Sequence, residues 1–136
     1  MKKAESTAGR LAVVVGRLNR RMLTAGPGLS QGLLSSLATV SKHGPMRLAD
    51  LANTELVSAP SITRIVAELE SRGLVTRTVD PDDGRAFLIA VTSAGNTLIN
   101  EARSSRAGYV SGLLASLDDT DLAAIEHSLP ALEKLI

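Results

Sequence analysis

The sequence predicts a mainly α-helical chain with a small β-wing, in the order α-α-α-α-β-β-α-α. Apolar residues recur at helical spacing through most of the 136 residues. Near the middle, a short helical segment over 47–53 is followed after a brief turn by a longer one over 58–70. Two strand-like runs, 74–79 and 87–91, come next and enclose a polar loop at 80–85. This order is that of a winged helix-turn-helix lobe with further helices at both ends.

Two helices are expected before the helix-turn-helix. The first covers about 5–25 and carries an apolar stripe of Leu11, Val14, Val15, Leu18 and Met22. Gly26-Pro27-Gly28 ends it. Ser30 is a suitable N-cap for the second helix, which Gly44-Pro45 ends and whose core-facing residues are Leu33, Leu34, Leu37 and Val40.

Ser58 is the expected N-cap of the fourth helix. Pro60 is tolerated in its first turn, where a backbone N–H would be unpaired anyway. Arg72-Gly73 supplies a last-turn cation and a glycine for the C-terminus. The side chains expected to face the core are Ile62, Ile65, Val66 and Leu69.

The alternation of the first strand places Val75, Arg77 and Val79 on the face expected to turn inward. After the second strand, Thr92 caps a long helix over about 93–117, in which Gly108 and Gly112 suggest a kink or a close helix contact. A last helix begins near Thr120, and Pro130 is expected to kink or split it.

Composition narrows the function. The length fits a single domain over 1–136, with a winged lobe at 30–92 and terminal helices at 1–25 and 93–136. No apolar run reaches the roughly 20 residues of a membrane helix, so we expect a cytoplasmic chain without a membrane partner. The absence of cysteine excludes disulfides and thiolate-bound zinc. Phe87 and Tyr109 are the only aromatic residues, which disfavours proteins that stack single-stranded bases.

The leading end of the 58–70 helix is suited to a DNA major groove. A helix N-terminus offers unpaired N–H groups to phosphate, and small hydroxyl side chains let the helix approach base edges closely. The residues expected to contact DNA there are Ser58, Pro60, Ser61, Thr63 and Arg64. For such a helix alone, the simpler interpretation is an ordinary cap followed by a solvated arginine.

The loop between the strands carries a second candidate contact. Arg85 at the tip of a hairpin could enter a narrow, electronegative minor groove. Asp83, two residues earlier, is expected to hold the guanidinium in a fixed pose. The simpler alternative is a polar turn with a surface ion pair. Asp80 and Asp82 are interpreted as turn residues.

Arg77 leaves two interpretations open. It pairs with a carboxylate as a structural residue, or it lines a cavity for an anionic ligand. His43 and His127 lack ligand-like neighbours and are expected to be surface or capping residues. No carboxylate pair, nucleophile–base set or phosphate-binding glycine loop stands out. We therefore expect no enzyme, no cofactor and no metal.

Apolar stripes near both ends exceed what one small lobe can cover. Two copies that bury these stripes against each other would form an interface above about 2,000 Å², the range of obligate dimers. The residues assigned to dimerisation are Leu11, Val15, Leu18, Leu113, Ile125, Leu129 and Leu132.

Five segments together resemble the MarR family of bacterial winged-helix regulators: 48–52, 57–64, 69–77, 80–86 and 91–95. The resemblance covers nearly the whole chain, in the family's order. It implies an obligate homodimer that binds double-stranded DNA at a pseudo-palindromic operator and regulates transcription. It further implies repression or activation of transcription, often relieved by a small phenolic or carboxylate ligand, and of the two we expect repression. By matching position it assigns the same residues to the major and minor grooves.

The chain departs from the family's pattern at two points. Gly84 stands where many members have a second basic residue, which predicts weaker wing affinity. The scarcity of aromatic residues puts a response to a phenol in doubt. Two competing functions stay open. One is a winged-helix dimer that binds protein partners, and the other is a small-molecule-binding module without specific DNA binding.

Overall fold

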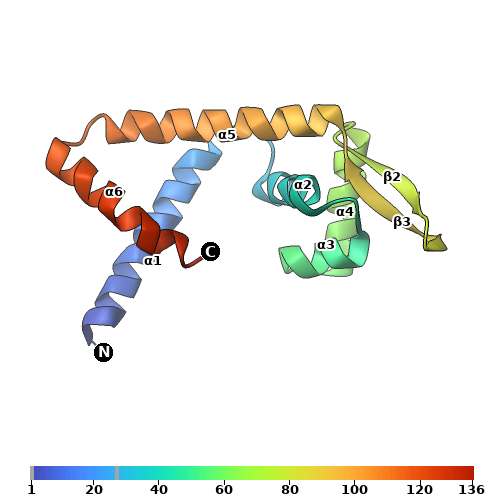
Figure 1. Cartoon of the computed structure of the whole chain (residues 1–136), viewed down its shortest axis with the longest axis horizontal. Helices are drawn as coiled ribbons and strands as arrows, with labels where there is room; N and C mark the ends of the chain where they lie inside the picture. The colour runs from blue at the N-terminus through green and yellow to red at the C-terminus, as the bar shows by residue number, and fades with distance from the viewer. Residues whose placement is uncertain (1, 27) are drawn as a thin grey trace. The chain divides into compact units, whose positions relative to one another are not determined.

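The computed structural model describes residues 2–26 and 28–136, and its elements follow the predicted order with one addition (Figure 1). Within these residues they are α1 Lys2–Leu23, α2 Gln31–His43, β1 Met46–Arg47, α3 Leu48–Glu55, α4 Ala59–Ser71, β2 Val75–Asp80, β3 Asp83–Val91, α5 Ser93–Leu114 and α6 Asp119–Glu133. The chain divides into two compact units. Residues 26–103 form one, called the lobe here, and residues 1–25 with 104–136 form the terminal-helix unit.

The helix starts show how local the folding signals are. The Ser30 and Ser58 hydroxyls accept hydrogen bonds from the backbone N–H groups three residues later, which confirms both caps. Thr92 likewise accepts from the Gly95 N–H, at 3.1 Å. The last helix, however, is capped by Asp118 rather than begun at Thr120, because the Asp118 carboxylate accepts from the Asp121 N–H at 2.8 Å.

The wing belongs to a three-stranded antiparallel sheet in the order β1-β3-β2. β1 was not predicted, since two residues are too few to show an alternation; it pairs Met46 with Ile89 and Arg47 with Leu88. The pairing of β2 with β3 runs regularly from Val75 opposite Val91 to the wing. Near the tip the register shifts, so that Asp80 pairs with Asp83 and residues 84–86 are left out of the regular ladder.

The hairpin extends beyond the helices of the lobe, and this corrects one prediction (Figure 1). Val75 is 2% exposed at the root of the wing, as expected for an inward-facing residue. Val79, which shares its alternation, is 69% exposed. The expectation that Val79 turns inward is therefore wrong, because the inner face of a projecting strand loses its cover toward the tip.

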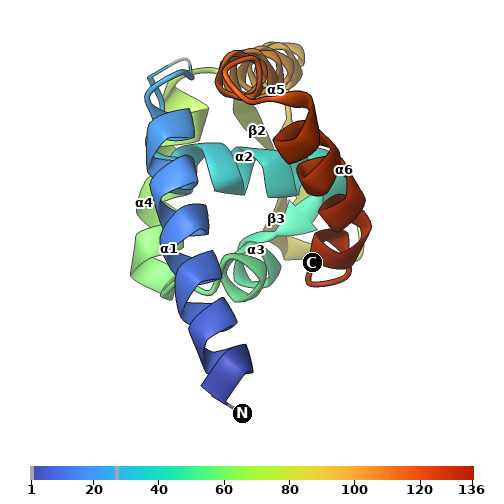
Figure 2. The ribbon, with the colours of Figure 1, turned by 90° about the vertical axis from the view of Figure 1, so that its left-hand side faces the viewer.

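Helix α2 contacts α3, α4 and β3 and so lies at the centre of the lobe (Figure 2). At the helix turn, Leu56 has a left-handed backbone (φ 56°) and is 90% exposed. Gly95 lies so close to the Leu74 carbonyl that a Cβ atom would clash, so glycine lets α5 begin against the sheet. The buried core is made by Leu33, Leu37, Val40, Leu51, Ala52, Ile62, Val66, Leu69, Leu74, Val75, Ile89 and Ile99.

Ser36 is an exception within this apolar interior. It is 1% exposed, and its hydroxyl forms no hydrogen bond with the described residues. A buried polar group without a partner costs about 1–3 kcal/mol. We expect Ser36→Ala to raise the free energy of unfolding by about 1 kcal/mol, measured by urea denaturation. An equal or lower stability would show that the hydroxyl has a partner in solution.

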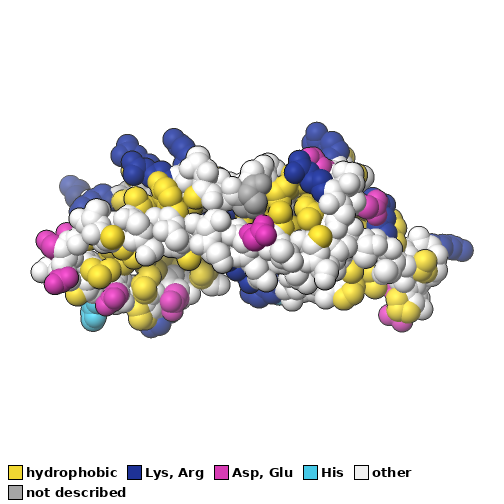
Figure 3. All heavy atoms as spheres, turned by 90° about the horizontal axis from the view of Figure 1, so that it is seen from above, with side chains coloured by type: hydrophobic (Ala, Val, Ile, Leu, Met, Phe, Trp, Pro, Cys, Tyr) yellow, Lys and Arg dark blue, Asp and Glu magenta, His cyan; other side chains and the backbone are white. Residues whose placement is uncertain are grey.

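The terminal-helix unit lacks a core of its own. In its described residues, 2–25 and 104–136, no side chain is fully buried. α5 runs unbroken through Gly108 and Gly112. α6 continues through Pro130, so the split that was one of the two outcomes expected there is wrong. Apolar side chains show on this surface (Figure 3), and the large exposed ones are Val13, Val14, Val15, Leu18, Leu117, Ile125, Leu129, Leu132, Leu135 and Ile136. No helix in the described part of the chain is long and apolar enough to span a membrane.

Candidate nucleic-acid interface

The leading end of α4 presents a polar surface to solvent. Its buried residues, Ile62, Val66 and Leu69, hold the opposite side of the helix in the lobe. Ser61 is half-buried, and the other residues predicted to contact DNA are exposed: Ser58, Pro60, Thr63 and Arg64. The structure therefore brings these five residues onto one accessible helix end.

Hydrogen bonds shape this end of the helix. The Ser58 hydroxyl donates to the Ser61 hydroxyl at 2.9 Å, and Thr63 donates to the Ala59 carbonyl at 2.8 Å. Arg64 forms no ion pair with the described residues. A short surface lined by hydroxyl groups, with an arginine that forms no ion pair with the described residues, can hydrogen-bond to base edges and to phosphate.

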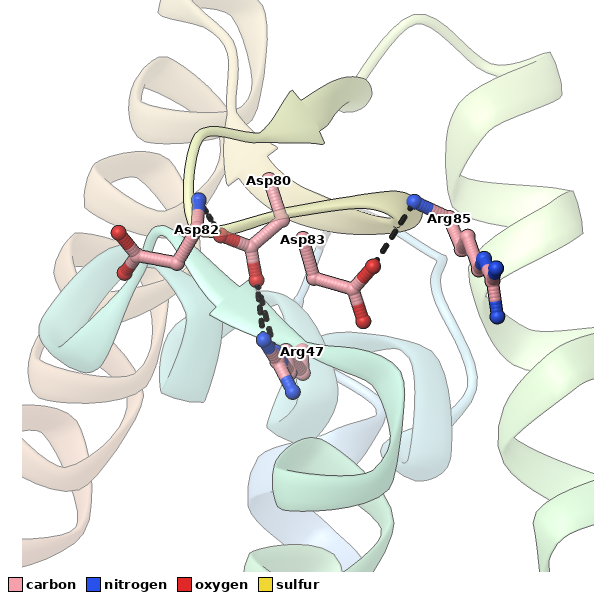
Figure 4. A network of polar contacts seen from close by, with 5 residues as sticks. All are labelled: Arg47, Asp80, Asp82, Asp83 and Arg85. Atoms are coloured by element: carbon pink, nitrogen blue, oxygen red, sulfur yellow. Dashed lines mark hydrogen bonds and ion pairs between the residues drawn. The ribbon is translucent and has the colours of Figure 1, made fainter.

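The wing tip differs in detail from the sequence-based expectation. The Asp83 carboxylate accepts a hydrogen bond from the backbone N–H of Arg85 at 3.0 Å. Figure 4 shows the Arg85 guanidinium directed away from that carboxylate. The expected contact between the Asp83 carboxylate and the guanidinium is therefore wrong. Asp83 acts on the backbone of the tip and leaves the Arg85 side chain free to reach outward.

A polar network at the wing turn was not predicted from the sequence (Figure 4). Asp80 is only 5% exposed, and its carboxylate accepts from the Arg47 Nε at 2.8 Å and Nη2 at 2.7 Å. It also accepts from the Asp82 backbone N–H at 2.9 Å. Asp80 is thus more than a turn residue. The hydrogen bond from Asp82 and the one from Arg47 hold the pKa of the Asp80 carboxyl below its usual value.

This lowered pKa gives stability a pH dependence. A carboxyl whose folded-state pKa is depressed adds stability above its unfolded pKa, and that stability is lost as pH falls through the folded value. The pKa of Arg47 is raised, mainly by its hydrogen bond to Asp80, so Arg47 stays charged across this range. We expect the stability difference between the wild type and Asp80→Asn to shrink from neutral to acid pH. Urea midpoints at several pH values measure it, and a difference independent of pH would contradict the assignment.

Arg77 ties the wing to α4. Its Nε lies 3.0 Å from the Glu70 Oε2, and its guanidinium lies 4.5 Å from the centre of the Phe87 ring. These contacts support the structural interpretation of Arg77 over the ligand-binding one, since the guanidinium is already paired. Glu70 could not be identified as the partner from sequence, because several carboxylates lie at comparable distances along the chain.

A hollow of about 480 Å³ lies beside the wing turn. It is lined by His43, Pro45, Met46, Arg47, Asp50, Asp80, Pro81, Asp82 and Leu88.

The described residues include no group of three or more His, Cys, Asp or Glu that could hold a metal ion. His43 and His127 are both exposed, as expected.

Comparison with known proteins identifies the family. The MarR family model matches residues 29–87, which include α2 to α4 and most of the wing. The HTH-type transcriptional regulator MT0903.1 of Mycobacterium tuberculosis is 35% identical over 116 residues, covering 84% of this chain and 81% of that protein. The chain belongs to the MarR family.

Solved MarR-like structures share the fold. A MarR family protein from Bacillus stearothermophilus aligns with a TM-score of 0.79 and 21% identity, over 98% of this chain and 94% of that one. A mutant of MepR from Staphylococcus aureus, solved bound to an oligodeoxyribonucleotide, aligns with a TM-score of 0.73 and 17% identity, over 96% and 98%. The family match and the mycobacterial relative make the chain a MarR-family transcriptional regulator with a DNA-binding winged helix, and its relatives are regulators rather than enzymes.

Proposed function

We propose that this MarR-family chain is a homodimeric repressor that binds double-stranded DNA at a pseudo-palindromic operator. The observation that carries the proposal is the pairing of two exposed features in one lobe. They are the hydroxyl-lined end of α4 with its free Arg64, and the wing with the outward-directed Arg85. MepR, which shares the fold, binds DNA, and this supports the same use of the lobe here.

The two features take different grooves in this proposal. The major groove accepts an α-helix and displays a distinct donor and acceptor pattern for each base pair. α4 enters it by its leading end, where Arg64 reaches a guanine or a phosphate and the small residues allow a close approach. Arg85 enters the neighbouring minor groove, whose negative potential is strongest where A·T-rich sequence narrows it.

A second copy of the chain is the proposed cover of the terminal-helix unit. A unit without any buried side chain among its described residues has too little apolar burial of its own for stability. The exposed stripes on α1 and α6 include the predicted dimerisation residues Val15, Leu18, Ile125, Leu129 and Leu132, while Leu11 and Leu113 are half-buried. Symmetric burial of these stripes gives the two-fold symmetry that a pseudo-palindromic operator requires.

Repression follows when such a dimer occupies a promoter and excludes the polymerase. Relief by a small anionic or phenolic ligand stays a prediction. Because Arg77 is already paired with Glu70, an anionic ligand would need either to displace that carboxylate or to use another cation.

Salt dependence of duplex binding tests this function against a winged-helix dimer that binds only proteins. Each phosphate contact releases counterions, so the logarithm of the binding constant falls linearly with the logarithm of salt concentration. We expect a steep negative slope on duplex DNA for the wild type. Absence of measurable duplex binding at low salt would favour the protein-binding alternative.

A further inference from the structure

We propose that two ion pairs fasten strand β2 to different elements of the lobe, and that Arg77 and Asp80 are thereby positioning residues for DNA recognition. Neither needs to contact DNA in this account. Each sets where the tip of the wing lies relative to α4. The inference rests on the proposed function, because it assumes that α4 and Arg85 take neighbouring grooves of one duplex.

The first ion pair joins β2 directly to α4. Glu70 lies in the last turn of that helix, and its carboxylate is 3.0 Å from the Arg77 Nε. The Phe87 ring of β3 lies against the same guanidinium, 4.5 Å from its carbon to the ring centre. One planar side chain of β2 thus contacts both α4 and β3. An arginine held by a carboxylate and a ring face has little rotational freedom.

The second ion pair spans the sheet. Arg47 lies on β1, which is separated from β2 by the central strand β3. Its guanidinium binds Asp80 at the last residue of β2, and Asp80 also holds the Asp82 N–H of the turn. Arg47 is the N-cap residue of α3 but makes no capping hydrogen bond, although Ser, Thr, Asp or Asn is preferred there. Arg47 thus leaves the start of α3 without a side-chain cap, and its guanidinium instead binds Asp80 at the wing turn.

These contacts matter because of how the wing is built. A two-stranded ribbon is marginally stable alone and twists easily. Beyond Val79 the ladder shifts register, and residues 84–86 lie outside the regular pairing. Arg85 would therefore move as the hairpin moves, unless other residues fixed both the middle of the hairpin and its turn. Arg77 holds the middle and Asp80 holds the turn.

The consequence is that the protein should discriminate between duplexes by the spacing between the major-groove site under α4 and the minor-groove site under the wing. A fixed wing favours an A·T-rich step at one position relative to the bases under α4. A loose wing would accept that step at neighbouring positions. The readout is therefore a ratio of affinities between duplexes, which a general loss of stability or charge does not change.

The experiment uses the full-length dimer and duplexes with constant bases under α4. The flank under the wing is either entirely G·C or carries a short A·T-rich tract, placed in register or shifted by one base pair either way. Dissociation constants are measured by fluorescence anisotropy for the wild type, Arg77→Ala, Arg77→Lys, Glu70→Ala, Asp80→Asn and Arg85→Ala. Glu68→Ala is the matched control, because Glu68 forms a similarly exposed ion pair with Arg72, the C-cap residue of α4, and this pair does not involve the wing.

We expect the wild type and Glu68→Ala to prefer the in-register tract over both shifted tracts. Arg77→Ala, Glu70→Ala and Asp80→Asn should bring that ratio towards one, with Arg77→Lys between, since lysine restores the charge without the planar contact on Phe87. Circular dichroism and sedimentation confirm that each variant remains a folded dimer. Because Arg77→Lys keeps the charge, it also serves if Arg77→Ala does not fold.

Three results would overturn the inference. Variants that keep both the wild-type ratio and the wild-type affinity show that the ion pairs do not position the wing. A uniform loss on every duplex with an unchanged ratio makes Arg77 or Asp80 a contributor to general affinity. If the wild type itself shows no flank preference and Arg85→Ala binds every duplex like the wild type, the minor-groove contact is absent. In that case this part of the proposed function falls together with the inference.

Discussion

Leu129→Asp should abolish the dimer and leave an unfolded or aggregated chain at micromolar concentration. Leu129 lies on the exposed apolar stripe of α6 with Ile125 and Leu132. Burying a leucine side chain contributes about 1.5–3 kcal/mol, and an unpaired buried carboxylate adds a larger penalty. Obligate dimers often have no stable folded monomer, so loss of the interface and loss of folding should coincide. Sedimentation and circular dichroism measure both.

His127→Asp is the matched control for that change. His127 is also exposed on α6, but two residues along a helix place it about 200° around the axis from both Ile125 and Leu129. We expect this variant to remain a folded dimer. Deletion of residues 118–136 should behave like Leu129→Asp. A folded wild-type monomer at micromolar concentration, or a Leu129→Asp dimer as stable as the wild type, would contradict the proposed interface.

Arg64→Ala should weaken binding to the preferred operator by about 1–3 kcal/mol, roughly 5- to 150-fold, if its guanidinium contacts a base. The loss should be concentrated on the preferred sequence, so that discrimination between operator variants falls. Competition between duplexes that differ at single base pairs measures this. Arg72→Ala, a cation at the C-terminal end of α4 paired with Glu68, is the control and should change affinity little.

The pattern of the Arg64→Ala loss distinguishes two roles. An equal loss on all sequences would make Arg64 a phosphate contact and would move base recognition to the small residues of the helix end. An unchanged affinity would contradict the proposal that α4 enters the major groove.

Sequence alone predicted the parts of the fold that depend on local signals. The hydroxyl caps at Ser30, Ser58 and Thr92 act over three residues, so each could be identified without tertiary structure. The apolar stripes of the lobe became its core for the same reason. Pro130 lies in the last turn of α6. A missing hydrogen bond there affects one turn at most, which explains why the helix is not split.

The features that position the candidate site depend on distant residues. Arg47 and Asp80 are 33 residues apart, and neither has a local pattern that reveals the other. β1 consists of two residues and exists through its pairing with β3. The sequence showed that Asp83 lies near Arg85, but it could not show that the Asp83 carboxylate binds the Arg85 backbone N–H rather than the guanidinium. The direction of these side chains depends on the register shift near Asp80, which arises from the pairing of β2 with β3.

The most direct test of a homodimeric, sequence-specific DNA-binding regulator is selection of bound duplexes from a random pool, followed by the mass of the purified complex. We expect enrichment of a pseudo-palindrome with two equivalent half-sites, bound by two copies of the chain. Affinity for the selected duplex should exceed that for a scrambled one by about 10³-fold or more. Failure to enrich any sequence, or a complex holding a single chain on one half-site, would contradict it.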